Sequence, residues 1–158
     1  MGEIMVTTSL AGQVGRRFNE IYWHDSVVRS LSVNYSPLDL GPELSYEIVL
    51  RAGMMTSRIN PKEEEAFEPV EVRFEQARYF RADLDLLGMH VCGGSISYAE
   101  CFAESDFKRQ LFQTKIANTN APQFENYWAN LSHFLIYLCD PSGEINIIAK
   151  DFKLIKLL

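Results

Sequence analysis

The sequence has few of the features that mark secreted or membrane proteins. Its three cysteines, Cys92, Cys101 and Cys139, show no close pairing, which favours reduced thiols in a cytoplasmic protein over a disulfide framework. The longest apolar run is Phe134–Cys139, much shorter than the roughly 20 residues that span a bilayer. The first residues also lack the basic and then apolar segments of a signal peptide. We therefore expect a cytoplasmic protein that does not enter the membrane.

Positive charge is scarce as well. The chain has 15 Lys and Arg against 21 Asp and Glu, a formal net charge of -6, and its isoelectric point is near 5.1. No basic stripe with interleaved aromatic residues occurs, so the sequence disfavours nucleic-acid binding. An acidic surface favours a basic protein as a partner.

The motifs of common enzymes are absent too. No Gly-x-Ser-x-Gly elbow, Walker loop or Gly-x-Gly-x-x-Gly fingerprint occurs, and these motifs position nucleophiles or phosphates. His90, Cys92 and Cys101 lie within twelve residues of one another, but they lack the paired spacing that places ligands around zinc. We expect no metal, no cofactor and no enzymatic activity.

What the chain does have is material for a core. It has 158 residues, of which 47% are hydrophobic and 12% aromatic, without a repeat or linker. This size and composition predict a single domain over residues 1–158. Residues 1–14 carry little pattern and are expected to form a loosely ordered lead-in. Phe18, Ile21 and Tyr22 share one helical face and predict a short helix over residues 15–22.

Most of the remaining chain has the period of two that is typical of strands. Residues 106–117 fit either a helix or a strand, residues 79–89 fit a strand or a short helix, and residues 117–126 are expected to form a loop. Asp140-Pro141-Ser142-Gly143 predicts a tight hairpin, and the change of phase at Ala149–Asp151 predicts a β-bulge. The expected fold is mainly β, an antiparallel β-sandwich or partly open barrel with one or two short helices. The alternating apolar residues that predict its strands are Leu31, Val33 and Tyr35; Leu44, Tyr46, Ile48 and Leu50; Val70, Val72 and Phe74; Ile96 and Tyr98; Phe134, Ile136 and Leu138; and Ile145, Ile147 and Ala149.

One segment combines residue types that can carry chemistry: Trp23, His24, Asp25 and Ser26. His24 and Asp25 could form an acid–base pair with Ser26 as a nucleophile. On an extended chain, however, neighbouring side chains point in opposite directions, so His24 and Asp25 are expected not to pair. The favoured interpretation is structural, with Trp23 anchoring the core while Asp25 and Ser26 bond to the backbone. A third reading is a contact site for a partner.

A second candidate pair is Asp83 and Asp85, which share one face if they lie on a strand. Two such carboxylates can bind a cation or transfer protons. No third oxygen ligand or glycine follows them, as a calcium loop would require. A solvated strand face near Arg78 and Arg81 is the favoured interpretation.

Three segments together resemble small bacterial β-rich domains of uncharacterised or immunity-protein-like families. They are Tyr22–Ser26, which carries the Trp-His-Asp-Ser motif, Val70–Phe74, and Ser142–Ala149. The resemblance implies a single-domain bacterial protein without enzymatic activity. Our leading hypothesis is a protein-binding domain, and the resemblance points to an immunity protein that neutralises a toxin. The alternative is a ligand-binding or hydrolytic β domain that uses His24 and Asp25, or Asp83 and Asp85.

Overall fold

Strands make up most of the structure, as the alternating sequence predicts. The computed structural model describes residues 10–36, 45–55, 67–84, 94–116, 123–140 and 142–157. Eight strands form one antiparallel sheet that is not closed, in the order β4-β7-β6-β5-β1-β2-β3-β8. This confirms the predicted mainly β, antiparallel fold. The strands are β1 (Val27–Ser36), β2 (Ser45–Met55), β3 (Phe67–Ala77), β4 (Tyr79–Leu84), β5 (Ser95–Phe102), β6 (Ser132–Asp140), β7 (Ser142–Ala149) and β8 (Asp151–Lys156).

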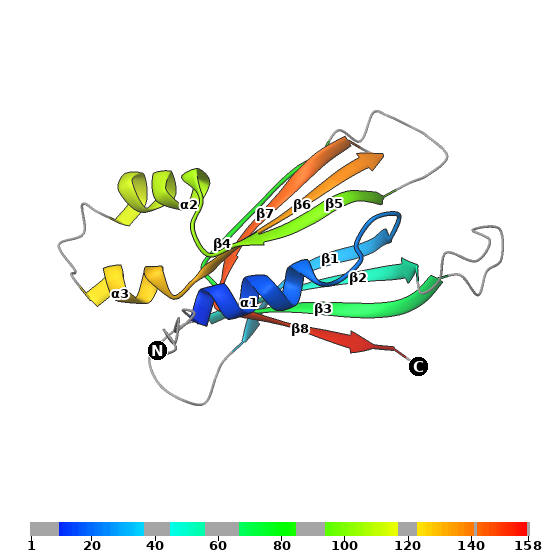
Figure 1. Ribbon diagram of the computed structural model, residues 1–158, viewed down its shortest axis with the longest axis horizontal. Helices are drawn as coiled ribbons and strands as arrows, with labels where there is room; N and C mark the ends of the chain where they lie inside the picture. The colour runs from blue at the N-terminus through cyan, green and yellow to red at the C-terminus, as the bar shows by residue number, and fades with distance from the viewer. Residues whose placement is uncertain are drawn as a thin grey trace, which may run out of the picture.

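The sheet bends into two four-stranded layers (Figure 1). One layer contains β4, β7, β6 and β5, and the other contains β1, β2, β3 and β8. Between β5 and β1 the register has a single pair, Val27 opposite Ser95. A backbone hydrogen bond of 2.8 Å from the N–H of Val28 to the carbonyl of Gly94 lies beside this pair. The two layers are therefore joined through β1 and β5 at one short contact.

A second junction joins the layers where β3 continues into β4 and β7 continues into β8. Glu75 lies opposite Asp151 and Tyr79 lies opposite Ile148, so three residues face two across the corner. Gln76 takes a φ of 50° there, as the extra residue of a bulge does. The phase change predicted at Ala149–Asp151 falls at this corner. The extra residue, however, lies on the β3–β4 side of the corner and not at Ala149–Asp151.

Three α-helices pack around the sheet: α1 (Leu10–Asn19), α2 (Asp106–Leu111) and α3 (Gln123–Ala129). Helix α1 buries Ala11, Val14, Gly15 and Phe18, which have the i, i+3, i+4, i+7 spacing of one face. The helix predicted at residues 15–22 is therefore shifted toward the N-terminus, because α1 begins at Leu10 and ends at Asn19. Residues 10–14 of the expected lead-in are helical, and residues 1–9 lie outside the described residues.

Helix α2 settles the ambiguous segment in favour of a helix, and α2 continues into a π-helical segment, η2 (Phe112–Ile116). The expected loop at residues 117–126 is wrong at its end, because α3 begins at Gln123. A helix this short depends on tertiary contacts, and Tyr127 of α3 supplies them. Its hydroxyl accepts a 2.8 Å hydrogen bond from Arg78 Nε, and the Arg78 guanidinium lies 5.0 Å from the centre of its ring. No helix in the described ranges is long and apolar enough to cross a membrane.

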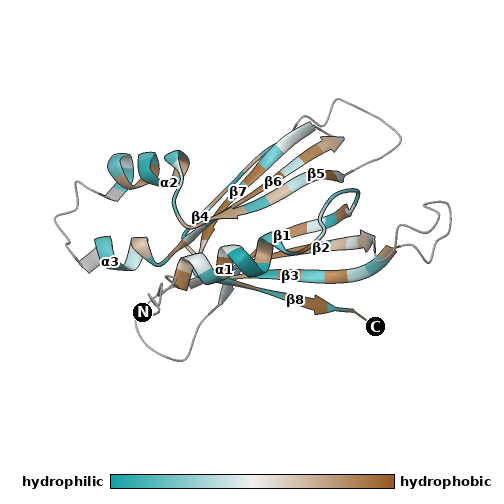
Figure 2. Ribbon diagram, in the orientation of Figure 1, coloured by the Kyte–Doolittle hydropathy of each residue, from teal (hydrophilic) through white to brown (hydrophobic). Residues whose placement is uncertain are grey.

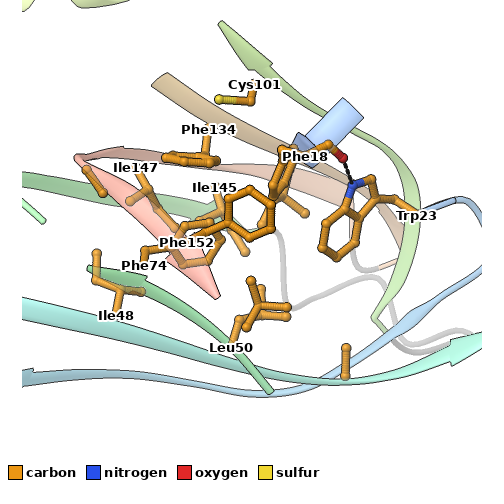
Figure 3. Packing of buried hydrophobic residues seen from close by; sticks show 14 of the residues in the cluster. Phe18, Trp23, Ile48, Leu50, Phe74, Cys101, Phe134, Ile145, Ile147 and Phe152 are labelled. Atoms are coloured by element: carbon orange, nitrogen blue, oxygen red, sulfur yellow. Dashed lines mark hydrogen bonds between the residues drawn. The ribbon is translucent and has the colours of Figure 1, made fainter. Parts of the chain in front are cut away.

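Aromatic side chains from both layers and from α1 form the centre of the core. The Phe18 ring lies 5.1 Å from the rings of both Phe134 and Phe152, and 6.4 Å from that of Phe74, as Figure 3 shows. Burying each such side chain contributes about 1.5–3 kcal/mol. These ring contacts connect α1, through Phe18, to both layers.

In Figure 2 the strands carry much of the hydrophobic colour, whereas α2 is largely polar.

Helix α1 also covers part of the free edge of β5. The side-chain amide of Asn19 donates to the carbonyl of Cys101 at 3.0 Å, and its oxygen accepts from the N–H of Cys101 at 2.7 Å. This pair of hydrogen bonds replaces those of a neighbouring strand. A Cβ added at Gly15 would lie 3.4 Å from the same carbonyl, so the small residue lets the helix approach closely. The edge of β5 is thus protected at Cys101.

Candidate functional site

Trp23 is a core residue. Its side chain is 4% exposed, and its ring stacks on that of Phe18 with centroids 4.6 Å apart. The indole N–H donates a 2.9 Å hydrogen bond to the Phe18 carbonyl at the end of α1, drawn as a dashed line in Figure 3. This confirms the predicted anchoring role of Trp23 between the helix and the first strand.

His24 and Asp25 lie on the surface and do pair, contrary to our expectation. Nδ1 of His24 lies 3.0 Å from Oδ2 of Asp25, and both side chains are more than half exposed. The expectation assumed an extended chain. Instead, the two residues form a turn in which Asp25 takes a φ of 66°, and this left-handed conformation turns adjacent side chains toward each other.

Ser26 points away from this pair into the protein. Its side chain is fully buried, and among the described residues its hydroxyl has no hydrogen-bond partner. Its backbone N–H donates to the Trp23 carbonyl at 3.1 Å, and its carbonyl accepts from Ile96 at 2.7 Å. The predicted side-chain bond from Ser26 to the backbone is therefore wrong. The four residues do not converge on one point, as a nucleophile, a base and an orienting acid must.

The other predicted candidates are only partly described. Asp83 lies on β4 with its side chain 74% exposed, 4.0 Å from Arg81, in agreement with a solvated strand face. Asp85 lies outside the described residues, and so do His90 and Cys92. Burial raises the pKa of the Cys101 thiol to about 12, which disfavours the thiolate that binds metals. Among the described residues, no three His, Cys, Asp or Glu side chains are grouped to hold a metal ion.

Sequence reasoning missed a buried polar network on the outer face of the β5–β6–β7 layer. Nδ1 of His133 lies 2.8 Å from Oγ of Ser105, and its Nε2 lies 2.8 Å from Oδ1 of Asn146. The imidazole is 3% exposed and stacks on Phe107 of α2 with centroids 4.7 Å apart. No spacing in the sequence could reveal these contacts, because Ser105, His133 and Asn146 belong to three separate elements.

The order Ser-His-Asn looks like a catalytic triad, but the details favour a structural role. Ser105 is the N-cap of α2, and its Oγ accepts a hydrogen bond of 3.0 Å from the N–H of Lys108. The third member, Asn146, has no negative charge to stabilise an imidazolium. Burial is the main reason that the pKa of His133 lies below its ordinary value, so the ring is neutral at pH 7. The network fixes α2 against the sheet.

The clearest exposed feature is strand β1. Beyond the Val27–Ser95 pair, β1 has only β2 as a neighbour in the described sheet. The strand predicted from Leu31, Val33 and Tyr35 is confirmed. Val33 is 50% and Tyr35 is 55% exposed, and β5 does not pair with this part of β1. We call residues Ser30–Tyr35 the open edge of β1.

The open edge of β1 carries no charged side chain. Tyr46, which is 45% exposed on β2, extends its apolar face, and the rings of Tyr35 and Tyr46 lie 6.0 Å apart. The two outermost strands of the sheet are different. β4 carries the exposed Arg81 and Asp83, and β8 carries exposed lysines, the usual protection against strand pairing. The open edge of β1 lacks this protection.

The charges on the outer face of β2 and β3 neutralise one another. Arg73 Nε donates to Glu71 at 2.7 Å, and Arg51 Nε donates to the same carboxylate at 3.3 Å. The hydrogen bond from Arg73 is the main cause that lowers the pKa of Glu71. These arginines are occupied by a buried carboxylate, so this face is not a basic binding surface.

Comparison with known proteins does not indicate a family or a function for this chain. No family model, no characterised protein and no solved structure matches this chain. The resemblance to immunity-protein-like domains therefore stays a prediction, and the function is inferred from the geometry of the described residues.

Proposed function

We propose that this protein is a non-catalytic domain that binds another protein, and that the partner adds an extended segment to the open edge of β1. The observation that carries the proposal is the open edge of β1, residues Ser30–Tyr35, which has no second neighbour among the described strands, two exposed apolar side chains and no charge. Strand addition gains affinity from backbone hydrogen bonds and gains specificity from alternate side chains.

The side chains of the open edge suit this role. Val33 and Tyr35 lie on the same face, because they are two residues apart on a strand. Tyrosine is enriched among the residues that dominate binding energy at interfaces, and the Tyr35–Tyr46 pair offers a wide apolar surface. A partner segment with alternating apolar residues would cover this face while its backbone pairs with β1.

The formal charge of -6 favours a basic partner, since opposite charges accelerate association. Basic toxins that act on nucleic acids are proteins of this kind. The resemblance to immunity proteins makes such a toxin the first partner to test.

The proposal is tested by capture from the source organism with the wild-type protein and two variants. Val33→Lys places a charge on the open edge, and Leu154→Lys places the same charge on β8, where Leu154 is 37% exposed. We expect one partner to be captured by the wild type and by Leu154→Lys but lost with Val33→Lys. Binding must then be reproduced with the purified partner. Equal capture by all three proteins would contradict strand addition at β1.

A further inference from the structure

A small cavity lies between α3 and the segment formed by α2 and η2. Its volume is about 260 Å³, below the roughly 300–1,000 Å³ of typical small-molecule sites. It is therefore sized for a single small group. The residues that line it are Glu104, Arg109, Phe112, Glu125, Trp128 and Ala129.

Two half-buried aromatic rings form the apolar part of this cavity. Phe112 and Trp128 have ring centroids 6.2 Å apart at an interplanar angle of 41°, so neither ring stacks flat on the other. An indole face attracts an ammonium or guanidinium ion, and a guanidinium also stacks on it. Phe112 begins the π-helical segment, a local departure from α-helix that is frequent at functional sites.

In the part of the chain that the structure describes, the ion pairs around the cavity leave one carboxylate of its lining without a partner. Arg109 Nη1 donates to Asp106 at 2.6 Å, which reduces its capacity to hold an anion. The buried Lys108 Nζ donates to Glu104 at 3.2 Å. Glu125 has no ion-pair or hydrogen-bond partner among the described side chains. Among the described residues, the cavity thus presents an aromatic surface beside a carboxylate that has no ion-pair partner.

We infer that this cavity is a binding site for a single alkylguanidinium or alkylammonium group. The alkyl part packs against Phe112 and Trp128, and the charged end reaches Glu125. The same chemistry is found in an arginine or lysine side chain of a protein and in a small free amine. The inference is independent of strand addition at β1, because none of the lining residues belongs to β1.

The two tryptophans allow a direct test by ¹H–¹⁵N NMR of the purified protein. The probes are ethylguanidinium, its neutral isostere N-ethylurea, and a short capped peptide with one arginine. We expect ethylguanidinium to shift the indole signal of Trp128 with saturation, and to leave that of Trp23 in place, since Trp23 is bonded to Phe18 in the core. Trp128→Phe assigns the signal. Tighter binding of the peptide would identify a protein side chain as the source, and equal binding would identify a free cation.

Two carboxylate variants separate the site from general charge attraction. Glu125→Gln is expected to weaken ethylguanidinium binding about tenfold, the effect of losing one charge-assisted contact. Glu20→Gln, which removes an exposed carboxylate just beyond α1, is expected to leave the affinity unchanged. An equal response to N-ethylurea, unchanged affinity of Glu125→Gln, or no saturable shift at millimolar ethylguanidinium would overturn the inference.

Discussion

At the scale of single residues, Trp23 and His24 have opposite roles although they are neighbours. Trp23 is buried and bonded to the end of α1, whereas His24 is exposed and pairs with Asp25. The indole anchors the helix to the core, whereas the imidazole makes only a solvent-exposed contact with a carboxylate, which is worth little.

Replacing Trp23 with Ala is expected to lower the free energy of unfolding by about 3–5 kcal/mol, the cost of removing a buried aromatic side chain. His24→Ala is the matched control, with an expected change within about 0.5 kcal/mol. Urea unfolding followed by circular dichroism measures both. A loss as large for His24→Ala as for Trp23→Ala would show that the exposed pair stabilises the fold.

His133 predicts a pH dependence of stability. Burial places its pKa in the folded protein below the value of 6.5 of the free side chain. The unfolded chain then binds a proton more readily, so this residue's contribution to stability is complete above pH 6.5 and is lost as the pH falls through the lower, folded pKa. NMR titration of the His133 ring measures that pKa directly. A value at or above 6.5 would contradict the buried, neutral imidazole.

At the scale of elements, the junction of β5 with β1 depends on a glycine. Gly94 takes a φ of 83°, and a Cβ added there would lie 2.7 Å from the carbonyl of Val28. This residue lies where the two layers are joined by the Val27–Ser95 pair. Only a residue without a side chain can bring the two backbones this close.

Gly94→Ala is therefore expected to destabilise the fold by about 1–3 kcal/mol through strain at a positive φ and the close contact. Ser95→Ala, at the next residue, serves as the control and should have a smaller effect. Thermal unfolding of both variants compares them. If Gly94→Ala melts at the wild-type temperature, the single β1–β5 junction does not hold the layers together.

The strands were predictable because alternation is a local signal, and residues such as Ile145 and Ile147 carry it clearly. The point where the β1–β5 pairing ends could not be predicted, because it depends on the path of a strand that is distant in the sequence. For this reason the sequence could not show that Val33 and Tyr35 are about half exposed. The Ser105–His133–Asn146 network was equally hidden, since it joins three distant elements. The His24–Asp25 pair was missed because one residue with a positive φ reverses the expected side-chain directions.

At the scale of the whole molecule, charged side chains protect the two outermost strands, β4 and β8, against pairing with another chain. The open edge of β1, an interior strand, carries no such charges. β1 lies in the middle of the strand order, yet most of its length has no second neighbour among the described strands. The negative net charge and the uncharged open edge of β1 have different consequences. The net charge affects how fast a basic partner arrives and makes that rate sensitive to salt, whereas the edge determines where the partner pairs.

The most direct test of strand addition is amide hydrogen exchange of this protein with and without its purified partner. We predict that exchange slows in β1 between Ser30 and Tyr35, where the partner's backbone forms new hydrogen bonds, while β4 and β8 are unchanged. Protection confined to β4, β8 or the helices, with β1 exchanging as in the free protein, would contradict the proposed mode of binding.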